Sequence, residues 1–376
     1  MSEAYIAGRG LACALGDDLA QALRALRAGG VAPAPFQINA ELSTPYLAIP
    51  PITPSVTPSV APSVAPTAAD WTASTRTRVL DAAAQSGALA TSRRGALFLA
   101  TTSFDLGARE LQQTFEGDAA TFAVSFAEQV ALWLAWQGPV FTVCTACTSA
   151  INALLSAQAL IRAGDVTDAL VLGLELGNRY TLGGFLSMQL LASAQAQPLG
   201  AARDGLVLGD AVAALYVSAQ PARWRLCGGA NVVDNSDPAG ATAAAVAAMA
   251  RQALAASGIT PAQVDLIKLQ AAGSPNNDAT ELQGLRQVFP TLPALVSLKR
   301  WLGHTLGAAG AAETALLTAC IEAGLWPAPG YALDPVLGAA FATQAPTRLR
   351  HVLAVVLGFG GGHAAVVIED LQAARP

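Results

Sequence analysis

The sequence is poor in charged residues, aromatic residues and cysteine. Charged residues make up 12% of the 376 positions, aromatic residues make up 6%, and the formal net charge is −5. This acidic balance argues against general nucleic-acid binding, which needs a basic surface. Five cysteines are too few for a disulfide framework in a chain of this length. We therefore expect reduced thiols and a cytoplasmic protein.

The sequence also lacks an apolar run long enough to cross a membrane, although 53% of its residues are hydrophobic. A spanning helix needs about 20 consecutive apolar residues. The Ala-rich stretches here are interrupted, for example by Arg251 and Glu313. The N-terminus has neither the basic region nor the long apolar region of a signal peptide, so we expect none. The composition favours a large core in which small side chains are buried in tightly packed helices.

The segment from Pro50 to Pro66 repeats the unit P-S-V. Proline fixes φ and has no N–H to donate, so this segment can form neither a helix nor a central strand. Its composition has two interpretations, an extended surface loop or linker and a partner-docking segment.

Short runs of β-type residues alternate with Ala-rich stretches along the rest of the chain. Residues 4–8 are predicted as a strand and 17–26 as a helix, with Asp17 or Asp18 as its N-cap. Further strands are expected at 96–101, 141–143, 169–173, 211–217, 266–269, 294–297 and 352–357. The alternation is typical of the α/β class, and the apolar runs without polar alternation predict strands buried on both faces.

The segment V-C-T-A-C-T-S-A-I-N-A-L, residues 143–154, places Cys147 between a predicted buried strand, 139–143, and a predicted helix. A thiol at such a turn lies at the positive end of the helix dipole, which favours the thiolate. Because the thiolate is the form that attacks acyl groups, Cys147 is the candidate nucleophile. The alternative is an inert buried thiol.

Two other motifs have weaker interpretations. Cys144 and Cys147 form C-x-x-C, which occurs in redox pairs and in halves of metal sites. No second Cys/His pair with metal-ligand spacing accompanies it, so we expect no metal. The glycines at 8–10 and 358–362 lack the full G-x-G-x-x-G of a dinucleotide site and are predicted as tight turns.

Three further segments carry Gly or small residues directly after a predicted strand. They are I-K-L-Q-A-A-G-S-P-N-N-D-A-T-E (267–281), S-L-K-R-W-L-G-H-T-L-G-A-A-G-A-A-E (297–313) and L-G-F-G-G-G-H (357–363). Together with T-A-C-T-S and the block at 202–211, they resemble the β-ketoacyl-acyl-carrier-protein synthases of the thiolase superfamily, along most of the chain. The resemblance implies a thiolase-like αβαβα five-layer sandwich of two similar halves with mixed sheets. We expect these halves at 1–222 and 223–376.

The resemblance also implies a role for each matching residue. Cys147 takes the acyl chain from acyl carrier protein, and His304 is one of two active-site histidines beside it. Lys299 helps to set the charge of the site, Glu313 completes that network, and Phe359 is the gating aromatic residue. No resident cofactor is implied, because the substrates are carried on the phosphopantetheine of acyl carrier protein.

The second and last segments depart from the family pattern. Where the family reads A-H-G-T-x-T-x-x-N-D, this chain reads L-Q-A-A-G-S-P-N-N-D, so Gln270 stands in place of the other catalytic histidine. Ala272 replaces a threonine that would hydrogen-bond the pantetheine arm, and Ser274 replaces the next one and is the remaining pantetheine-binding candidate. Gly362 and His363 replace Thr-Asn in the last segment. His363 does not restore the lost histidine, because it belongs to a different segment.

These departures affect the two steps of a condensation, acyl transfer and decarboxylation, differently. Acyl transfer to Cys147 needs a thiolate and oxyanion donors, for which the family analogy offers the backbone N–H groups of Cys147 and Phe359. Decarboxylation of a malonyl unit needs a stabilised enolate. The Gln270 amide can donate a hydrogen bond, but it carries no charge and shuttles no proton. We expect acyl transfer to survive and elongation to be impaired.

Three functions are compatible with this pattern. The favoured one is the chain-length-factor-like partner of a complete ketosynthase, in a heterodimer of an aryl-polyene or related type II system that elongates a polyketide, polyene or fatty acyl chain. The second is an independently active condensing enzyme with a Cys–Gln–His site, working as a homodimer. The third is an acyltransferase or acyl-carrier hydrolase that uses Cys147 alone. Chain-length factors of aromatic polyketide systems usually lose the cysteine, which this chain keeps.

Overall fold

Ten strands form one continuous sheet in the structure, a computed structural model that describes residues 2–52, 66–112, 119–236 and 240–373. The strands of this sheet are β1 (Ala4–Cys13), β4 (Ala96–Ala100), β5 (Val140–Val143), β6 (Asp168–Glu175), β8 (Ala211–Ser218), β9 (Trp224–Val233), β10 (Leu266–Lys268), β11 (Ala294–Val296), β12 (His351–Leu357) and β13 (Gly362–Asp370). A small second sheet contains β2 (Ala34–Gln37), β3 (Ser43–Leu47) and β7 (Leu208–Gly209). Most of the Pro-rich segment lies outside the described residues, so its interpretations stay predictions.

The large sheet consists of two halves with the same strand order and direction. The first half runs β5-β4-β6-β8-β1 and the second runs β11-β10-β12-β13-β9. In each half the first three strands are parallel and the other pairs are antiparallel. The halves join where β1 pairs with β9, with Ala4 opposite Leu226. This repetition is the pseudo-symmetry that the resemblance implied.

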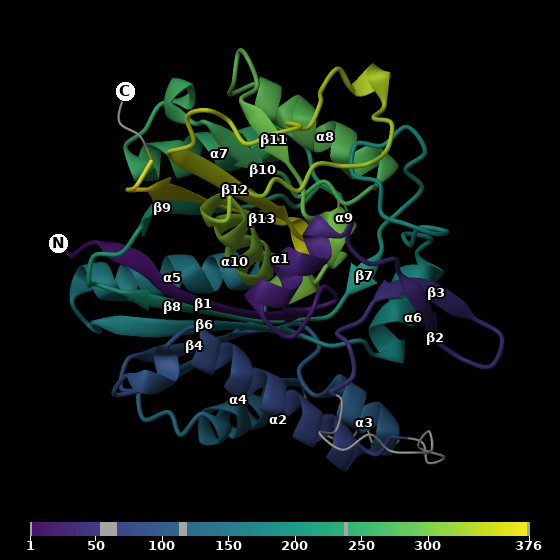
Figure 1. The fold of residues 1–376 in the computed structure, drawn as a ribbon, viewed down its shortest axis with the longest axis vertical. Coiled ribbons are helices and arrows are strands. Elements are labelled where there is room, and N and C mark those ends of the chain that lie inside the picture. The colour runs from purple at the N-terminus through teal and green to yellow at the C-terminus, as the bar shows by residue number, and fades with distance from the viewer. Residues whose placement is uncertain (1, 53–65, 113–118, 237–239, 374–376) are drawn as a thin grey trace.

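Helices complete five layers, as Figure 1 shows. The helices are α1 (Leu19–Arg27), α2 (Ala68–Gln85), α3 (Leu106–Gln112), α4 (Ala119–Trp133), α5 (Ser149–Ala163), α6 (Arg179–Ser187), α7 (Ala243–Ser257), α8 (Pro275–Arg286), α9 (Lys299–Leu302) and α10 (Ala309–Glu322), with short 3-10 turns at η1 (Ala88–Ala90), η2 (Pro261–Gln263), η3 (Leu306–Ala308), η4 (Pro335–Leu337) and η5 (Phe359–Gly361). Helices α2 and α4 cover the outer face of the first half, and α7 and α8 cover that of the second. Helices α5 and α10 lie between the halves. The expected αβαβα five-layer sandwich is confirmed.

Small side chains allow the two central helices to pack between the sheet halves. Ala150, Ala153 and Ala157 of α5 are fully buried, as are Ala311 and Ala315 of α10. Many of the alanines that contribute to the high hydrophobic fraction are therefore buried in these helices. No helix in the described part of the chain is long and apolar enough to cross a membrane.

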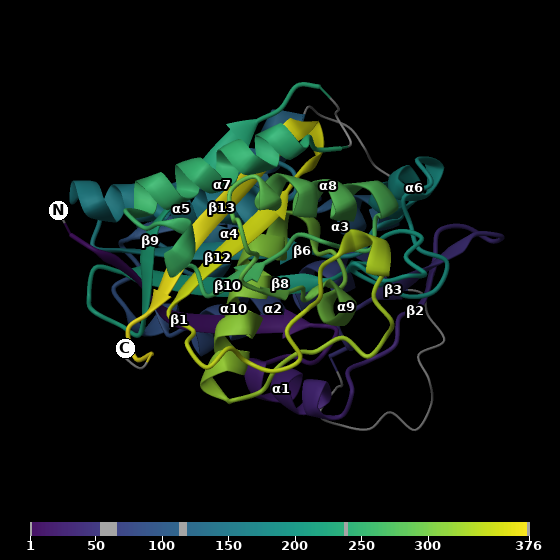
Figure 2. The same ribbon diagram turned by 90° about the horizontal axis from the view of Figure 1, so that it is seen from above.

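All the strands expected from the sequence are present, and the helix at 17–26 begins after Asp18, whose carboxylate accepts a hydrogen bond from the N–H of Gln21 at 2.6 Å. Strands β9 and β13 were not predicted, because glycines interrupt the first and open the second. The strands of the small sheet, β2, β3 and β7, were not predicted either. One prediction was wrong. The strand before Cys147 was expected to be buried, but β5 is the edge of the sheet, and Phe141 is 41% exposed there. Figure 2 shows the same layers from above.

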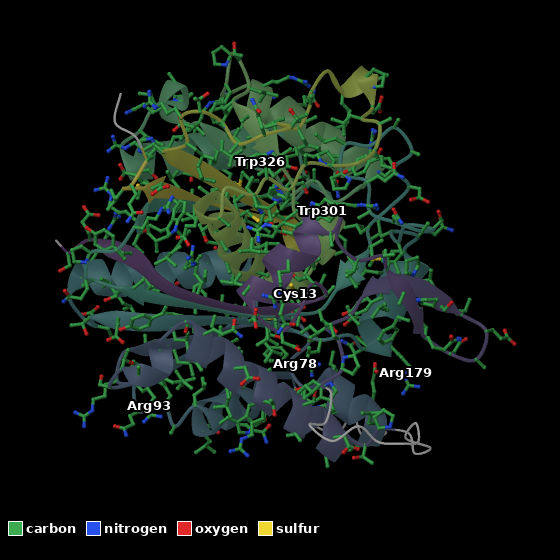
Figure 3. All side chains as sticks on the ribbon, viewed as in Figure 1. Cys13, Arg78, Arg93, Arg179, Trp301 and Trp326 are labelled. Atoms are coloured by element: carbon green, nitrogen blue, oxygen red, sulfur yellow. The ribbon has the colours of Figure 1, made fainter. Side chains whose placement is uncertain are left out.

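A tryptophan holds α9, the short helix that begins with Lys299, against the end of α1. Gly30 follows α1 with φ of 80°, and a Cβ at this position would lie 2.5 Å from ring atoms of Trp301. The indole N–H of Trp301 donates to the carbonyl of Pro327 at 3.4 Å. Figure 3 shows Trp301 beside α1, with Arg93 and Arg179 at the periphery of the molecule. These contacts fix the position of α9, and with it the position of Lys299.

Candidate active site

Cys147 lies in a tight turn between β5 and α5. The preceding residue, Ala146, has φ of 50°, a left-handed conformation that is unfavourable for a residue with a Cβ. Ser149 closes the turn, because its Oγ donates to the carbonyl of Ala146 at 2.6 Å and accepts from the N–H of Thr145 at 2.9 Å. Cys147 is only 4% exposed. The turn thus holds a buried thiol two residues before the start of α5.

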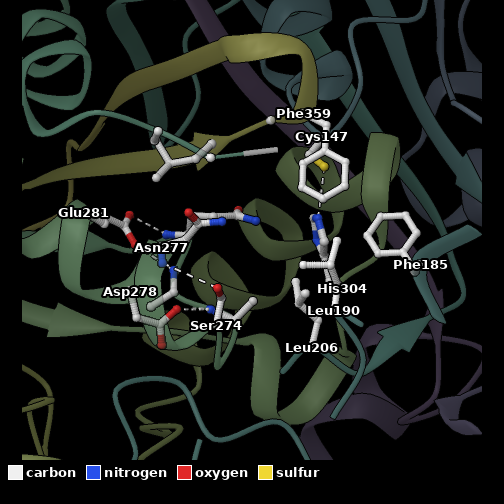
Figure 4. Close-up of a pocket in the computed structure, with 17 residues that line it drawn as sticks. Cys147, Phe185, Leu190, Leu206, Ser274, Asn277, Asp278, Glu281, His304 and Phe359 are labelled. Carbon is white, nitrogen blue, oxygen red and sulfur yellow. Dashed lines mark hydrogen bonds between the residues drawn. The ribbon is translucent and has the colours of Figure 1, made fainter. Parts of the chain in front are cut away.

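His304 contacts this thiol from the second half of the chain. Its Nε2 lies 3.0 Å from the Sγ of Cys147, and its Nδ1 lies 3.1 Å from the Nζ of Lys299 (Figure 4 shows the first contact). Because the ammonium of Lys299 can only donate, Nδ1 is the acceptor. A neutral His304 ring therefore carries its proton on Nε2, facing the sulfur.

Glu313 lies behind Lys299 and binds two lysines at once. One of its carboxylate oxygens accepts from Lys299 and the other from Lys268, and all three side chains are at most 2% exposed. Lys268 also donates to the carbonyl of Val355 at 2.6 Å. Sequence reasoning missed Lys268, although a charged residue in the otherwise apolar strand I-K-L was a signal.

Burial makes both reactive groups neutral at rest. It raises the pKa of Cys147 to about 11, although the positive charge of Lys299 and the backbone N–H groups of Phe359 and Cys147 act in the opposite direction. Burial, with the charges of Lys299 and Lys268, lowers the pKa of His304 well below its usual value. The helix dipole was expected to favour the thiolate, and burial of Cys147 acts in the opposite direction.

Gln270 follows β10 and faces the same cavity as Cys147 and His304. The backbone there is held by a carboxylate, because the N–H groups of Gln270 and Ala271 each donate to Glu281 at 2.7 Å. The Gln270 side chain is buried, at 8% exposed, and its Oε1 has no hydrogen-bond partner among the described residues. An unpartnered buried acceptor at this point fits a donor group on a bound substrate.

Two cavities meet at Cys147. The first, here called the polar cavity, has about 530 Å³ of empty space including its open mouth. It is lined by Cys147, Phe185, Leu190, Leu206, Gly240, Ala241, Gln270, Ala271, Ala272, Ser274, Asn277, Asp278, Glu281, His304, Leu357, Gly358 and Phe359. The second, here called the apolar cavity, has about 710 Å³ measured in the same way. It is lined by Thr102, Leu106, Ala146, Cys147, Tyr180, Thr181, Gly184, Phe185, Met188, Leu306 and Phe359.

The structure brings all seven expected site residues together. Cys147, His304, Lys299 and Glu313 form one chain of contacts, and Gln270, Ser274 and Phe359 line the polar cavity. Ser274 is also the N-cap of α8 and accepts from the N–H of Asn277 at 3.4 Å. Their roles in a reaction stay predictions.

Two further sequence motifs are not part of this arrangement. His363 is fully buried on β13 and does not line either cavity. Cys144 is exposed, and all five cysteines are free thiols. Within the described ranges no cluster of His, Cys, Asp and Glu is suited to a metal ion.

Two similar halves of an αβαβα sandwich, with a buried cysteine beside a histidine between them, define a thiolase-like protein. Comparison with known proteins agrees with this class. Residues 78–221 match the family model "Beta-ketoacyl synthase, N-terminal domain", and residues 227–329 match "Beta-ketoacyl synthase, C-terminal domain". The chain belongs to the β-ketoacyl synthase family.

Curated relatives include a mitochondrial 3-oxoacyl-[acyl-carrier-protein] synthase of Arabidopsis thaliana, 29% identical over 64% of this chain and 59% of the relative. Nodulation protein E of a Rhizobium species is 31% identical over 54% of this chain and 53% of the relative. The matches therefore span less than two thirds of these relatives.

Solved structures show the same fold over nearly the whole chain. A ketosynthase (ApeO) in complex with its chain length factor (ApeC) from Xenorhabdus doucetiae has a TM-score of 0.80 at 24% identity, with 98% of both chains covered. The ishigamide ketosynthase/chain length factor has a TM-score of 0.79 at 20% identity, over 99% of this chain and 100% of that chain.

Proposed function

We propose that this protein is a β-ketoacyl-acyl-carrier-protein synthase-like subunit that acts in the cytoplasm as the chain-length-factor-like partner of a complete ketosynthase. The heterodimer elongates a carrier-bound polyketide, polyene or fatty acyl chain by decarboxylative Claisen condensation. The observation that carries this proposal is Gln270, which faces Cys147 and His304 where the family has its second histidine. A neutral amide cannot supply the charge or the proton transfer that the decarboxylation step uses.

The two cavities give the substrate a place on either side of Cys147. The polar cavity, with Ser274 and the unpartnered Gln270 Oε1, suits the amide-containing phosphopantetheine arm of acyl carrier protein. The apolar cavity suits the acyl chain, because its lining includes Leu106, Met188 and Leu306. The substrate brings its own carrier group, so the proposed reaction needs no resident cofactor.

Exposed apolar side chains support the need for a partner. Tyr180 and Met188 line the apolar cavity and are 72% and 47% exposed, and Phe141 is exposed on the edge strand β5. Exposed apolar side chains favour a protein–protein contact. The shared fold with ketosynthase/chain-length-factor complexes is consistent with a second ketosynthase-like chain at this position.

A second candidate is an independently active condensing enzyme with a Cys–Gln–His site. The observation in its favour is the intact contact of 3.0 Å between His304 and Cys147, with Lys299 and Glu313 behind it. A subunit that only shapes a channel would not need this arrangement.

The experiment that separates the two is intact-mass spectrometry with product analysis. The protein is incubated alone, and as a one-to-one complex with a ketosynthase encoded beside it, with acyl- and malonyl-carrier protein. We expect elongated product only from the complex. Product from the protein alone would overturn the partner proposal and establish the second candidate. An acyl adduct that is then released as free acid would instead identify a hydrolase.

Variants define what each residue contributes. Cys147→Ala should abolish any acyl adduct on this subunit, whereas Cys144→Ala, three residues earlier and exposed, should leave it unchanged. Gln270→His should give the isolated protein elongation activity if the amide is what blocks decarboxylation. No product from Gln270→His, with Cys147 fully acylated, would contradict that explanation.

A further inference from the structure

The sequence contains 19 arginines but only two lysines, Lys268 and Lys299. Both are buried, and both bind the carboxylate of Glu313. Lys299 is the lysine that contacts His304, so its place in the site is already explained. Lys268 contacts Glu313 on the side away from Lys299, so it is further from the sulfur of Cys147. The chemistry described so far gives Lys268 no role.

Lys268 has a fixed position at the end of β10, between two neighbouring strands. Its backbone pairs with Val296 of β11 and with Ala354 of β12. Its ammonium donates to one oxygen of Glu313 and to the carbonyl of Val355, 2.6 Å away. Because Lys268 occupies this carboxylate oxygen, the other oxygen of Glu313 is directed toward Lys299. A rotation of Glu313 would break both contacts together.

The three charged side chains leave one positive charge in excess beside the imidazole. Lys268 on β10 and Lys299 on α9 are the cations, and Glu313 on α10 is the anion. Two other carboxylates face the network, Glu281 from α8 toward Lys268 and Glu175 from β6 toward Cys147. Burial raises the pKa of both carboxyl groups, which reduces their negative charge, and it also lowers the pKa of Lys268, against which the charge of Glu313 acts. The excess positive charge disfavours protonation of His304.

We propose that Lys268 is a positioning residue for the Cys147–His304 pair. Through Glu313 it holds Lys299 on Nδ1 of His304, and so it keeps the imidazole proton on Nε2, facing the sulfur and the thioester that binds there. The proposal rests on the acyl-transfer chemistry proposed for Cys147. It assigns a role at this site to a residue of the 267–281 segment to which the family resemblance gave none.

Nuclear magnetic resonance of the histidines tests this directly, because the chain has only three. In Lys268→Met the cation is lost, and the methionine faces a cavity lined by apolar groups such as Leu317 and Ala354. We expect the ring ¹⁵N shifts of His304 to lose the pattern of a single Nε2–H tautomer, and its titration to move up by about one pH unit. His351 and His363 should not change. Unchanged ring shifts and titration of His304 would overturn the proposal.

Control variants separate positioning from stability. Arg223→Met breaks another partly buried ion pair, in which Arg223 donates to Asp370 at 2.7 and 2.8 Å, away from the site. It should lower stability and leave His304 unchanged. Lys268→Arg keeps the cation and should preserve the Nε2–H tautomer. A tautomer lost in Arg223→Met as well would mean that the effect is general destabilisation, against the proposal.

The double variant Lys268→Met/Glu313→Gln decides the question if Lys268→Met does not fold. It restores one excess positive charge, on Lys299, but removes the group that anchors Lys299. We expect the His304 titration to return to low pH while its tautomer remains mixed. A wild-type tautomer in the double variant would overturn the positioning role.

Two further readouts do not depend on the proposed condensation activity. Lysine labelled with ¹³C at Cε gives two signals in the wild type and one in Lys268→Met, and a shift of the remaining signal reports displacement of Lys299. Alkylation of Cys147 by iodoacetamide should slow at least several-fold in Lys268→Met. If these readouts change but no carrier substrate acylates the wild type, the proposed function fails while the role of Lys268 stands.

Discussion

The rings of Phe185 and Phe359 stack with their centroids 5.2 Å apart and their planes at 14°. Both side chains line the polar cavity and the apolar cavity, as Cys147 does. The stacked pair therefore lies where the two cavities meet, beside Cys147 (Figure 4). Phe359 comes from a glycine-rich turn after β12, in which Gly360 and Gly361 have φ of 76°. A chain that passes from Cys147 into the apolar cavity has to move past these rings.

Removing one ring should join the cavities. In Phe359→Ala, we expect long-chain haloacetamides to alkylate Cys147 several-fold faster than in the wild type, with little change for iodoacetamide. The half-buried ring is expected to cost about 1–3 kcal/mol of stability when truncated. Phe141→Ala is the matched control, because Phe141 stacks on Phe98 at 4.9 Å at the sheet edge and lines neither cavity. Equal rates for both reagents in Phe359→Ala would mean that the ring does not restrict passage.

The apolar cavity should limit the length of the acyl chain, and Gly184 offers a test. Gly184 lines this cavity on α6, and a Cβ added there would meet no atom within 4 Å. Gly184→Leu should therefore fill the cavity without a clash and shorten the longest product of the complex by two or more carbons. Replacing a helical glycine should also stabilise α6 by roughly 0.5–1 kcal/mol.

The control for this prediction is the adjacent residue on the same helix. Gly183 does not line the apolar cavity, and its nearest neighbour, Ile38, lies 3.9 Å from an added Cβ. Gly183→Leu should change helix stability in the same direction and leave product length unchanged. Products of wild-type length from Gly184→Leu would show that the acyl chain does not enter this cavity.

The raised pKa of Cys147, about 11, predicts a steep pH dependence of its alkylation. At pH 7 roughly one thiol in 10⁴ is ionised at that pKa, so the rate with iodoacetamide should rise about tenfold per pH unit up to pH 10. Cys144→Ala removes the exposed thiol that would obscure the measurement. A rate that is already constant above pH 7 would contradict this prediction and indicate a resting thiolate–imidazolium pair with His304.

The sequence motifs predicted the site better than they predicted its charges. The turn that contains Cys147 and the glycine-rich segments have fixed local spacings. Cys147, His304 and Phe359 could therefore be predicted as site residues from the sequence. The protonation state of the Cys147 thiol could not be predicted from the motifs, because its pKa depends on burial by segments from both halves of the chain. Lys268 was missed because its contact with Glu313, 45 residues away in sequence, depends on the fold. The edge position of β5 depends on the strand order, which local patterns do not encode.

Glu281 should make the protein less stable as the pH rises toward neutrality. Burial raises its pKa from 4.5 to about 7, although it accepts hydrogen bonds from two backbone N–H groups. Between these pH values the folded protein binds a proton that the unfolded chain has released. The contribution of Glu281 to the unfolding free energy should therefore be highest below about pH 4.5. It should fall by about 1 kcal/mol per pH unit between pH 4.5 and pH 7. Urea unfolding at pH 5, 6, 7 and 8 measures this slope.

Glu281→Gln should flatten the slope between pH 5 and 7, even though it loses one backbone contact and is less stable overall. Glu322→Gln is the matched control, because Arg9 and Trp224 lower the pKa of Glu322, so its stabilising effect is lost only as the pH falls below 4.5. That variant should keep the wild-type slope between pH 5 and 7. If Glu281→Gln kept the same slope as the wild type, Glu281 would already be ionised in the folded protein. The dependence would then come from other buried carboxyl groups whose pKa is raised, such as Asp278, with a pKa raised to about 6, and Glu175.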